Sequence, residues 1–328
     1  MTIKELNIND IGTRKLIDTF LNNMRNVDVK QTTQWYELRD EQKKYLYIEC
    51  EKNKIILCCN TFELFDDKSG GKVLYLPRGP VYDDKYITFD ECIKYIYKYA
   101  KEKKFKFIRL NPNIPKKALN YDELRKLGYD ITIISEHSYD DLFESPREAI
   151  IKVDNVSKEE LLNYFHHKTR YNIRKSTRSN LECKITKNIN IEDYYKLYLQ
   201  TASRHSFTPH PLSYFKKLIE VFNDKVVFCS VFFNNMPLAI SINIKQSNTL
   251  YYLYGSSSDN NKNLFPSYRL HWEMIKYAID NHFEFYNFGG VFSDDDDMNN
   301  KDYGLMIFKS RFCYNGFTIY NPDLIIKI

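Results

Sequence analysis

A basic segment without a single acidic residue lies near the middle of the chain. The segment is HHKTRYNIRKSTR, residues 166 to 178, and its five cationic side chains are Lys168, Arg170, Arg174, Lys175 and Arg178. On a helix, Arg170, Arg174 and Arg178 recur every four residues and form one positive stripe. Because like charges on one helix face repel one another, the stripe predicts an anionic partner, and arginine suits bidentate contact with phosphate. The alternative is a solvated helix face, although such faces usually interleave acids with bases.

A second polar segment surrounds two prolines. SRHSFTPHPLSYF, residues 203 to 215, contains Arg204, His205, His210 and Tyr214. The prolines predict a rigid turn. Two histidines five residues apart, with no carboxylate or cysteine beside them, make a poor metal site. Two readings stay open for the segment, which are a structural loop with hydrogen-bonded histidines and a contact with substrate.

A tyrosine-rich strand comes next along the chain. Its residues YYLYGSSS place Tyr252 and Tyr254 on the same face, because alternate residues of a strand point the same way. Core packing explains part of this pattern. Tyr254 lies at the strand end beside Gly255, and a buried phenol needs a hydrogen-bond partner. We therefore expect Tyr254 to line a cleft.

The segment after residue 283 contains glycines, acids and one lysine in apolar surroundings. Gly289 and Gly290 follow the predicted strand and allow close approach of the backbone. The run Asp294 to Asp297 indicates a solvated loop, with a divalent cation as the alternative. Lys309 lies between Phe308 and Phe312, where partial desolvation would suit its ammonium to stabilise an oxyanion. A lysine that extends its head to water is the competing explanation.

Composition excludes several classes of protein. The chain has 328 residues, 43% of them hydrophobic, and a net charge of +5, so it is a folded protein and not a histone-like coat for nucleic acid. The 10 glycines form neither GxGxxG nor GxxxxGK[ST], which argues against dinucleotide and P-loop nucleotide sites. The seven cysteines show no zinc-like spacing and are expected to be reduced. No stretch is apolar enough for a membrane span or signal core, so we expect a cytoplasmic protein.

Hydrophobic patterning predicts two similar sets of elements. The first has strands at 44–50, 54–65 and 72–76, a helix at 89–103 and a strand at 105–110. The second has a strand at 149–155, a long basic helix at 155–178, a helix at 193–202, strands at 226–233, 237–245 and 249–257, a helix from Pro266 and a strand at 283–288. YAKEKKFKFIRLN, from Tyr99, also matches YAIDNHFEFYNFG, from Tyr277, at one constant offset. An internal duplication explains the match, and chance similarity of helix ends is the alternative.

Six motifs occur in the order seen in the FemABX family. They are YLPRGPVY, KTRYNIRKSTR, the strand end at Tyr254, WEMIKYA, YNFGGV and YGLMIFKSRF. The chain therefore resembles FemX-type, aminoacyl-tRNA-dependent peptidyltransferases. The resemblance implies a mixed α/β fold of two GNAT acyltransferase-like domains with a cleft between them, whose last strand returns to the first domain. The expected domains are 1–147 with 317–328, and 148–316, with no long helical arm.

The family's site residues can be carried over one by one. The family's phosphate-contacting base falls on Arg39, four residues after Trp35. Its substrate tyrosines fall on Tyr214 and Tyr254, and its active-site Phe-Lys pair falls on Phe308 and Lys309.

Two departures from the family pattern change the expected chemistry. The family's second phosphate-binding Arg is His210 here, which is expected to hold a diphosphate less firmly at neutral pH. Its Asp at the end of the first-domain strand is Asn111, so no carboxylate base is available there.

The implied reaction is aminolysis of aminoacyl-tRNA by a stem-peptide amine of a peptidoglycan precursor. Lys309 would stabilise the oxyanion, and the amine proton would pass to substrate groups or water. The acceptor is either UDP-MurNAc-pentapeptide or its lipid-linked form, so contact with the inner face of the membrane is compatible with this reading. The basic stripe fits either tRNA phosphates or the acceptor's diphosphate. No cofactor or metal is implied, and a monomer is expected.

Two other functions remain as alternatives. An acyl-CoA-dependent N-acyltransferase would share the domain type, but the pyrophosphate loop Q/R-x-x-G-x-G/A is absent. A catalytically silent RNA-binding or scaffold protein is opposed by the intact Phe308-Lys309 pair. The transferred amino acid is not marked by any short motif.

Overall fold

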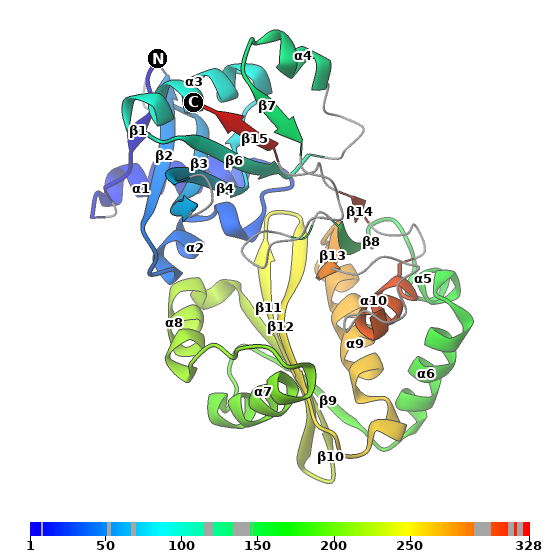
Figure 1. Ribbon diagram of the computed structural model, residues 1–328. Helices are drawn as coiled ribbons and strands as arrows, with labels where there is room; N and C mark the ends of the chain where they lie inside the picture. Colours follow the sequence, from blue (N-terminus) through cyan, green and yellow to red (C-terminus); the bar gives the residue numbers. More distant parts are fainter. Residues whose placement is uncertain are drawn as a thin grey trace. The chain divides into compact units, whose positions relative to one another are not determined.

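The chain folds into two compact units, Met1–Pro146 with Ile319–Ile328 and Arg147–Thr318. The computed structural model in Figure 1 describes residues 1–7, 9–50, 54–66, 70–114, 121–133, 145, 147–291, 303–313, 318–319 and 324–328. Each unit is built around one mixed sheet flanked by helices. The described residues therefore form the mixed α/β fold that the sequence predicts.

The sheet of the first unit has the order β1-β2-β3-β4-β6-β15-β7, with β5 on β3. Its strands are β1 (Lys4–Glu5), β2 (Lys43–Cys50), β3 (Lys54–Asp66), β4 (Gly71–Arg78), β5 (Val81–Tyr82), β6 (Phe107–Pro112), β7 (Ile131–Ile133) and β15 (Leu324–Lys327). Its helices are α1 (Ile11–Asn23), the 3-10 turn Val29–Gln31, α2 (Thr33–Leu38), α3 (Phe89–Glu102) and α4 (Tyr121–Lys126). The predicted return of the last strand is confirmed, because β15 pairs with β6 and β7.

Helix α3 shows how the sequence builds this unit. A capping box between Thr88 and Glu91 satisfies the first backbone N–H groups of the helix. Ile93, Ile96 and Ala100 then recur at helical spacing and are fully buried against the sheet. Burial of this apolar face packs α3 against the sheet, and the helix lies in the crossover connection from β4 to the parallel strand β6.

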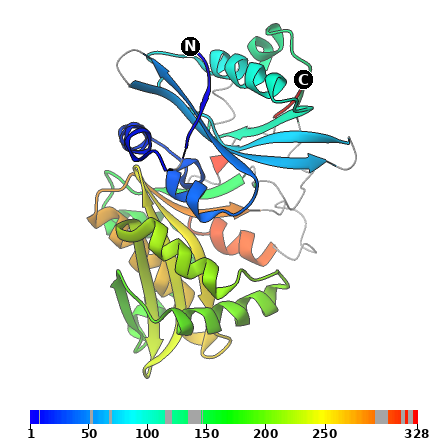
Figure 2. The ribbon, with the colours of Figure 1, turned by 90° about the vertical axis from the view of Figure 1, so that its left-hand side faces the viewer.

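The sheet of the second unit has the order β14-β8-β13-β12-β11-β10-β9. Its strands are β8 (Arg147–Lys152), β9 (Glu182–Thr186), β10 (Val226–Phe233), β11 (Met236–Gln246), β12 (Thr249–Ser257), β13 (Phe285–Val291) and β14 (Thr318–Ile319). Its helices are α5 (Lys158–Tyr164), α6 (His167–Arg178), α7 (Ile191–His205), α8 (Leu212–Phe222), α9 (Pro266–Asp280) and α10 (Tyr303–Ser310), with 3-10 turns at Asn223–Lys225 and Lys262–Leu264. Figures 1 and 2 show α7 and α8 on one face of this sheet and α9 on the other.

The two helix–strand units that the sequence aligns also have the same local geometry. Phe105 N donates to Ala100 O (2.9 Å), and Phe283 N donates to Ala278 O (3.0 Å) at the same offset. Lys104 and His282, one residue earlier, both have φ 60°. Each unit then continues into a strand that runs parallel to the last strand of its meander, β6 beside β4 and β13 beside β12.

One predicted element is wrong. The expected helix from 155 to 178 is two helices, α5 and α6, because Phe165 and His166 have extended backbone at the junction. The break turns the ring of Phe165 into the core, where it meets Trp272 (5.9 Å between ring centroids) and Phe312 (5.3 Å). These partners lie more than a hundred residues away in sequence, so no local signal marks the break.

Candidate active site

Two parallel strands of the second unit part from each other before their ends. β12 and β13 are paired from Thr249 with Phe285 to Tyr251 with Asn287, and the described residues beyond are not paired with each other. A bulge in β12 against β11 follows at once, where Tyr252 and Tyr254 face consecutive residues of β11. Consecutive residues of a strand point to opposite faces, so the predicted shared face of the two tyrosines is wrong: Tyr252 contacts His271 of α9, and Tyr254 contacts Tyr214 of α8.

Lys309 occupies the place where β13 leaves β12. Its side chain comes from the last turn of α10 and is only 6% exposed. The Nζ atom donates to Gly290 O (2.7 Å). Gly289 has φ +83°, and a Cβ built there would lie 3.9 Å from both Nζ and Tyr252 O. The ammonium is thus held in a water-poor site beside the separated strands, where a positive charge stabilises a developing oxyanion most strongly.

Phe308 forms an aromatic wall beside this lysine. Its ring lies 5.0 Å from that of Tyr268 and 5.4 Å from those of His271 and Phe312. Such edge and tilted contacts hold each ring in one orientation. The neighbouring rings therefore fix the position of the Phe308 ring, a constraint that a solvent-facing side chain would lack.

His271 is a buried histidine that the sequence analysis did not select. It is 3% exposed, and its Nδ1 atom lies 2.9 Å from the hydroxyl of Tyr286. Burial, aided by the positive charge of Lys309, lowers the pKa of His271 to about 3. The imidazole is therefore neutral at pH 7, and the positive charge in this part of the unit belongs to Lys309. A lone histidine among the apolar positions of α9 was the only sequence signal.

The predicted substrate residues His210, Tyr214 and Tyr254 lie together. The hydroxyls of Tyr214, on α8, and Tyr254, on β12, are 2.8 Å apart. His210 stacks on the ring of Tyr214 at 4.2 Å and 15°. Phe215 packs against all three rings, with centroid distances of 5.3 to 6.3 Å. Tyr254 is partly buried and has the polar partner that its position at the strand end predicted.

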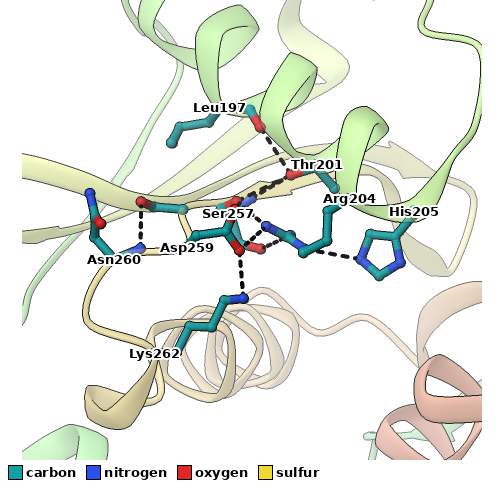
Figure 3. A network of polar contacts seen from close by, with 9 residues as sticks. Leu197, Thr201, Arg204, His205, Ser257, Asp259, Asn260 and Lys262 are labelled. Carbon is teal, nitrogen blue, oxygen red and sulfur yellow. Dashed lines mark hydrogen bonds and ion pairs between the residues drawn. The ribbon is translucent and has the colours of Figure 1, made fainter.

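A polar network fixes the end of β12 that carries Tyr254 (Figure 3). Arg204, at the end of α7, donates to Ser257 O (3.2 Å), Ser257 Oγ (2.8 Å) and Asp259 Oδ1 (2.9 Å). Thr201 joins the same strand by accepting from Ser257 N (3.0 Å). The predicted turn at 203–215 is thus partly helical, because Arg204 and His205 complete α7 and only the residues up to Pro211 form the connection.

The predicted basic stripe on α6 is divided by its surroundings. Arg170 is half-buried and donates to the carbonyls of Asn163 (3.1 Å) and Phe165 (2.5 Å), where it closes the end of α5. Lys168, Arg174, Lys175 and Arg178 are exposed. Arg170 therefore stabilises the helix junction, and the other four cations of the segment face solvent.

Arg39 and Asn111 belong to the first unit. Arg39 follows α2, forms an ion pair with Glu41 and lies 6.0 Å above the ring of Trp35. Asn111 is buried, and its Oδ1 atom accepts from Arg78 N (3.0 Å). Asn111 thus joins the ends of β6 and β4. The predicted cleft between the domains stays a prediction.

The described residues offer no evident place for a metal ion. They contain no group of three His, Cys, Asp or Glu side chains arranged to hold one. The predicted acidic run Asp294–Asp297 lies outside the described residues. All seven cysteines are free thiols, as expected. Among the helices that the structure describes, none has the length and hydropathy of a membrane span.

The repeated meander, helix and parallel strand define a tandem GNAT acyltransferase fold. A tandem GNAT protein from the clavulanic acid biosynthesis pathway matches with a TM-score of 0.55 and 7% identity over 99% of this chain and 97% of that one. The crystal structure of FemX matches with a TM-score of 0.82 and 17% identity over 100% of this chain and 98% of that one. The model of the FemAB family matches residues 13–234 and 231–320, and the chain belongs to this family.

Two curated relatives carry names of enzymes. The UDP-N-acetylmuramoylpentapeptide-lysine N(6)-alanyltransferase of Weissella viridescens is 23% identical over 94% of this chain and 91% of its own length. The Lipid II:glycine glycyltransferase of Staphylococcus epidermidis is 22% identical over 72% of each chain. The family resemblance stated from six sequence motifs is therefore confirmed.

Proposed function

We propose that this chain is an aminoacyltransferase that moves an amino acid from aminoacyl-tRNA to a stem-peptide amine of a peptidoglycan precursor. The relatives supply the class of reaction, since both are named for aminoacyl transfer to such precursors. The observation that carries the proposal is the buried ammonium of Lys309 beside the separated strands β12 and β13.

The reaction needs little covalent help from the protein. The acceptor amine attacks the ester carbonyl carbon of the donor, and a tetrahedral oxyanion forms. The C–O bond to the tRNA 3′ ribose then breaks, an amide is left, and the amine proton passes to the departing ribose oxygen, directly or through water. Lys309 stabilises the oxyanion, while Tyr214, Tyr254, His210 and Arg39 hold the acceptor.

The acceptor and the setting of the reaction are part of the same proposal. One relative is named for a nucleotide-linked pentapeptide and the other for lipid II, so both acceptors are candidates. We place the reaction in the cytoplasm, where charged tRNA is found, with a monomeric enzyme whose net charge of +5 suits loose contact with the anionic inner face of the membrane.

A transfer assay tests the proposal. The purified protein is incubated with a mixture of charged tRNAs and with each acceptor in turn, and the products are weighed by mass spectrometry. We expect one acceptor to gain one aminoacyl residue. Absence of product with every charged tRNA, together with transfer from an acyl-CoA, would show that the enzyme uses a different donor.

Substitution of Lys309 tests the role of the ammonium. Lys309→Met is expected to lower kcat about 10²- to 10³-fold with little change in acceptor KM, because it removes an interaction made only in the transition state. Lys196→Met, at an exposed lysine of α7, is the matched control. Lys309→Arg keeps the positive charge, so it distinguishes loss of charge from loss of folding. Unchanged circular dichroism spectra verify that the variants fold. A kcat of Lys309→Met within a few-fold of the parent refutes the assignment.

A further inference from the structure

The exposed face of α6 has a tyrosine at its centre and cations around it. Thr169, Ile173 and Ser176 are the buried positions of this helix. At about 100° per residue, Tyr171 points directly away from them. Its side chain is 61% exposed. A tyrosine in such a position buries little apolar surface and adds little to the stability of the fold. We call this surface the α6 face, and it comprises Lys168, Tyr171, Arg174, Lys175 and Arg178.

Among the residues that the structure describes, the cations of the α6 face have no acidic partner. None of the ion pairs between described residues involves Lys168, Arg174 or Arg178, and Lys175 lies over the ring of Phe265 at 5.0 Å. The basic residues of α7 differ, because Lys196 pairs with Asp193 and Arg204 with Asp259. A face of uncompensated like charges is unfavourable in isolation, and an anionic partner removes the repulsion.

The α6 face begins close to the candidate catalytic lysine. His166, at the start of α6, donates its backbone N–H to Arg311 O (3.0 Å), two residues after Lys309. The rings of Phe165 and Phe312 are 5.3 Å apart, and Figure 1 shows α6 beside α10. The 12 residues of α6 extend about 18 Å from this junction. The positive charge therefore forms a track that leads away from the site of acyl transfer.

We propose that the α6 face binds the RNA part of the donor next to its aminoacylated 3′ end, with Tyr171 stacked on an unpaired base and Arg174 and Arg178 on phosphates. This inference rests on the proposed function. Cations spread over three helical turns fit a chain of phosphates better than a single diphosphate. An exposed aromatic ring among arginines is the usual platform for a single-stranded base. A helix that enters a membrane surface carries a broad apolar face, and the α6 face has no aliphatic side chain.

Binding of a labelled RNA tests the inference. The probe is an uncharged, fluorescein-labelled RNA microhelix with a single-stranded ACCA 3′ end, and its affinity is measured by fluorescence anisotropy. Tyr171→Ala is expected to weaken binding about 10-fold, because loss of one base stack costs that order of affinity. Tyr171→Phe should retain binding. Tyr86→Ala, an exposed tyrosine of the first unit, is the control.

The arginines are tested by salt dependence. The double variant Arg174→Gln, Arg178→Gln should flatten the slope of log affinity against log salt by about 1.4 to 1.8, the value for two phosphate contacts. Acceptor KM at saturating donor should stay unchanged. Binding of the parent and of the variants to phosphatidylglycerol vesicles and to UDP is measured in parallel.

The outcomes separate this inference from the proposed function. If the parent transfers the amino acid and binds the microhelix, and the Tyr171 and arginine variants bind it equally well, the α6 face is not the RNA contact and the proposed function stands. If the substitutions weaken only vesicle or UDP binding, the inference is equally overturned. If the parent neither binds the microhelix nor uses charged tRNA, the proposed function itself fails.

Discussion

Acidification should destabilise the second unit through one buried histidine. His271 is neutral in the folded chain because burial lowers its pKa to about 3 from the ordinary value of 6.5. The unfolded chain binds a proton at this side chain below pH 6.5, whereas the folded chain does not. The free energy of unfolding therefore falls as the pH decreases below 6.5, and the loss is complete only near pH 3.

The size of the effect follows from the shift in pKa. The whole difference of 3.5 pH units corresponds to about 5 kcal/mol. Between pH 7.5 and pH 5.0, where most carboxylates stay ionised, the unfolded state gains about 2 kcal/mol from protonation of His271 alone. Solvent does not screen this side chain, because it is 3% exposed and packed among Tyr252, Phe288 and Phe308.

Urea unfolding at several pH values measures this loss. The chain has two tryptophans, so a Trp35→Phe background leaves Trp272, next to His271, as the reporter of the second unit. In this background His271→Gln should be less stable at pH 7.5, because the hydroxyl of Tyr286 loses its partner, but it should lose about 2 kcal/mol less on going to pH 5.0. His282→Asn, at an exposed histidine with φ 60°, is the control. Equal losses in His271→Gln and the parent background would refute the reasoning.

Two further predictions concern the residues around β12. Tyr214→Phe and Tyr254→Phe should each raise acceptor KM. Because the two hydroxyls are 2.8 Å apart, a double-mutant cycle should give a coupling energy of about 1 kcal/mol. Additive effects of the two substitutions in steady-state kinetics would contradict a shared role. Arg204→Leu should lower the free energy of unfolding of the second unit by about 1 to 3 kcal/mol, because Ser257 Oγ loses the donor that lies 2.8 Å away. Lys196→Leu, at an exposed position, should change it by less than about 0.5 kcal/mol, and equal urea midpoints for the two variants would show that the network adds no stability.

The repeated elements were predictable because local patterns determine them. Strands of the second meander are largely apolar runs bounded by turn residues, and Asn234 and Asn235 between β10 and β11 take the positive φ values, 48° and 63°, that the turn requires. The offset between Tyr99 and Tyr277 marks the duplication in the sequence itself. Fold class and duplication therefore needed no tertiary information.

The junction of α5 and α6 and the surroundings of the site depend on distant residues. Phe165 leaves the helix because Trp272 and Phe312 provide a place for its ring. Tyr254 was predicted to need a polar partner, but the partner, Tyr214, is 40 residues away, and no spacing rule connects them. His271 was missed because a single histidine among apolar helix positions is also typical of ordinary packing.

The two copies of the duplicated strand explain why the second unit carries the candidate chemistry. Asn111 and Gly289 each follow the equivalent phenylalanines, Phe107 and Phe285, by four residues. In the first unit β4 and β6 stay paired to Arg78 and Pro112, and the side chain of Asn111 bonds the backbone of Arg78, which closes the strand ends. In the second unit a glycine with φ +83° stands at that position, the strands part, and the ammonium of Lys309 bonds the next carbonyl. Replacement of one amide side chain by glycine thus accompanies the change from a closed strand end to one that admits the ammonium of Lys309, the candidate catalytic cation.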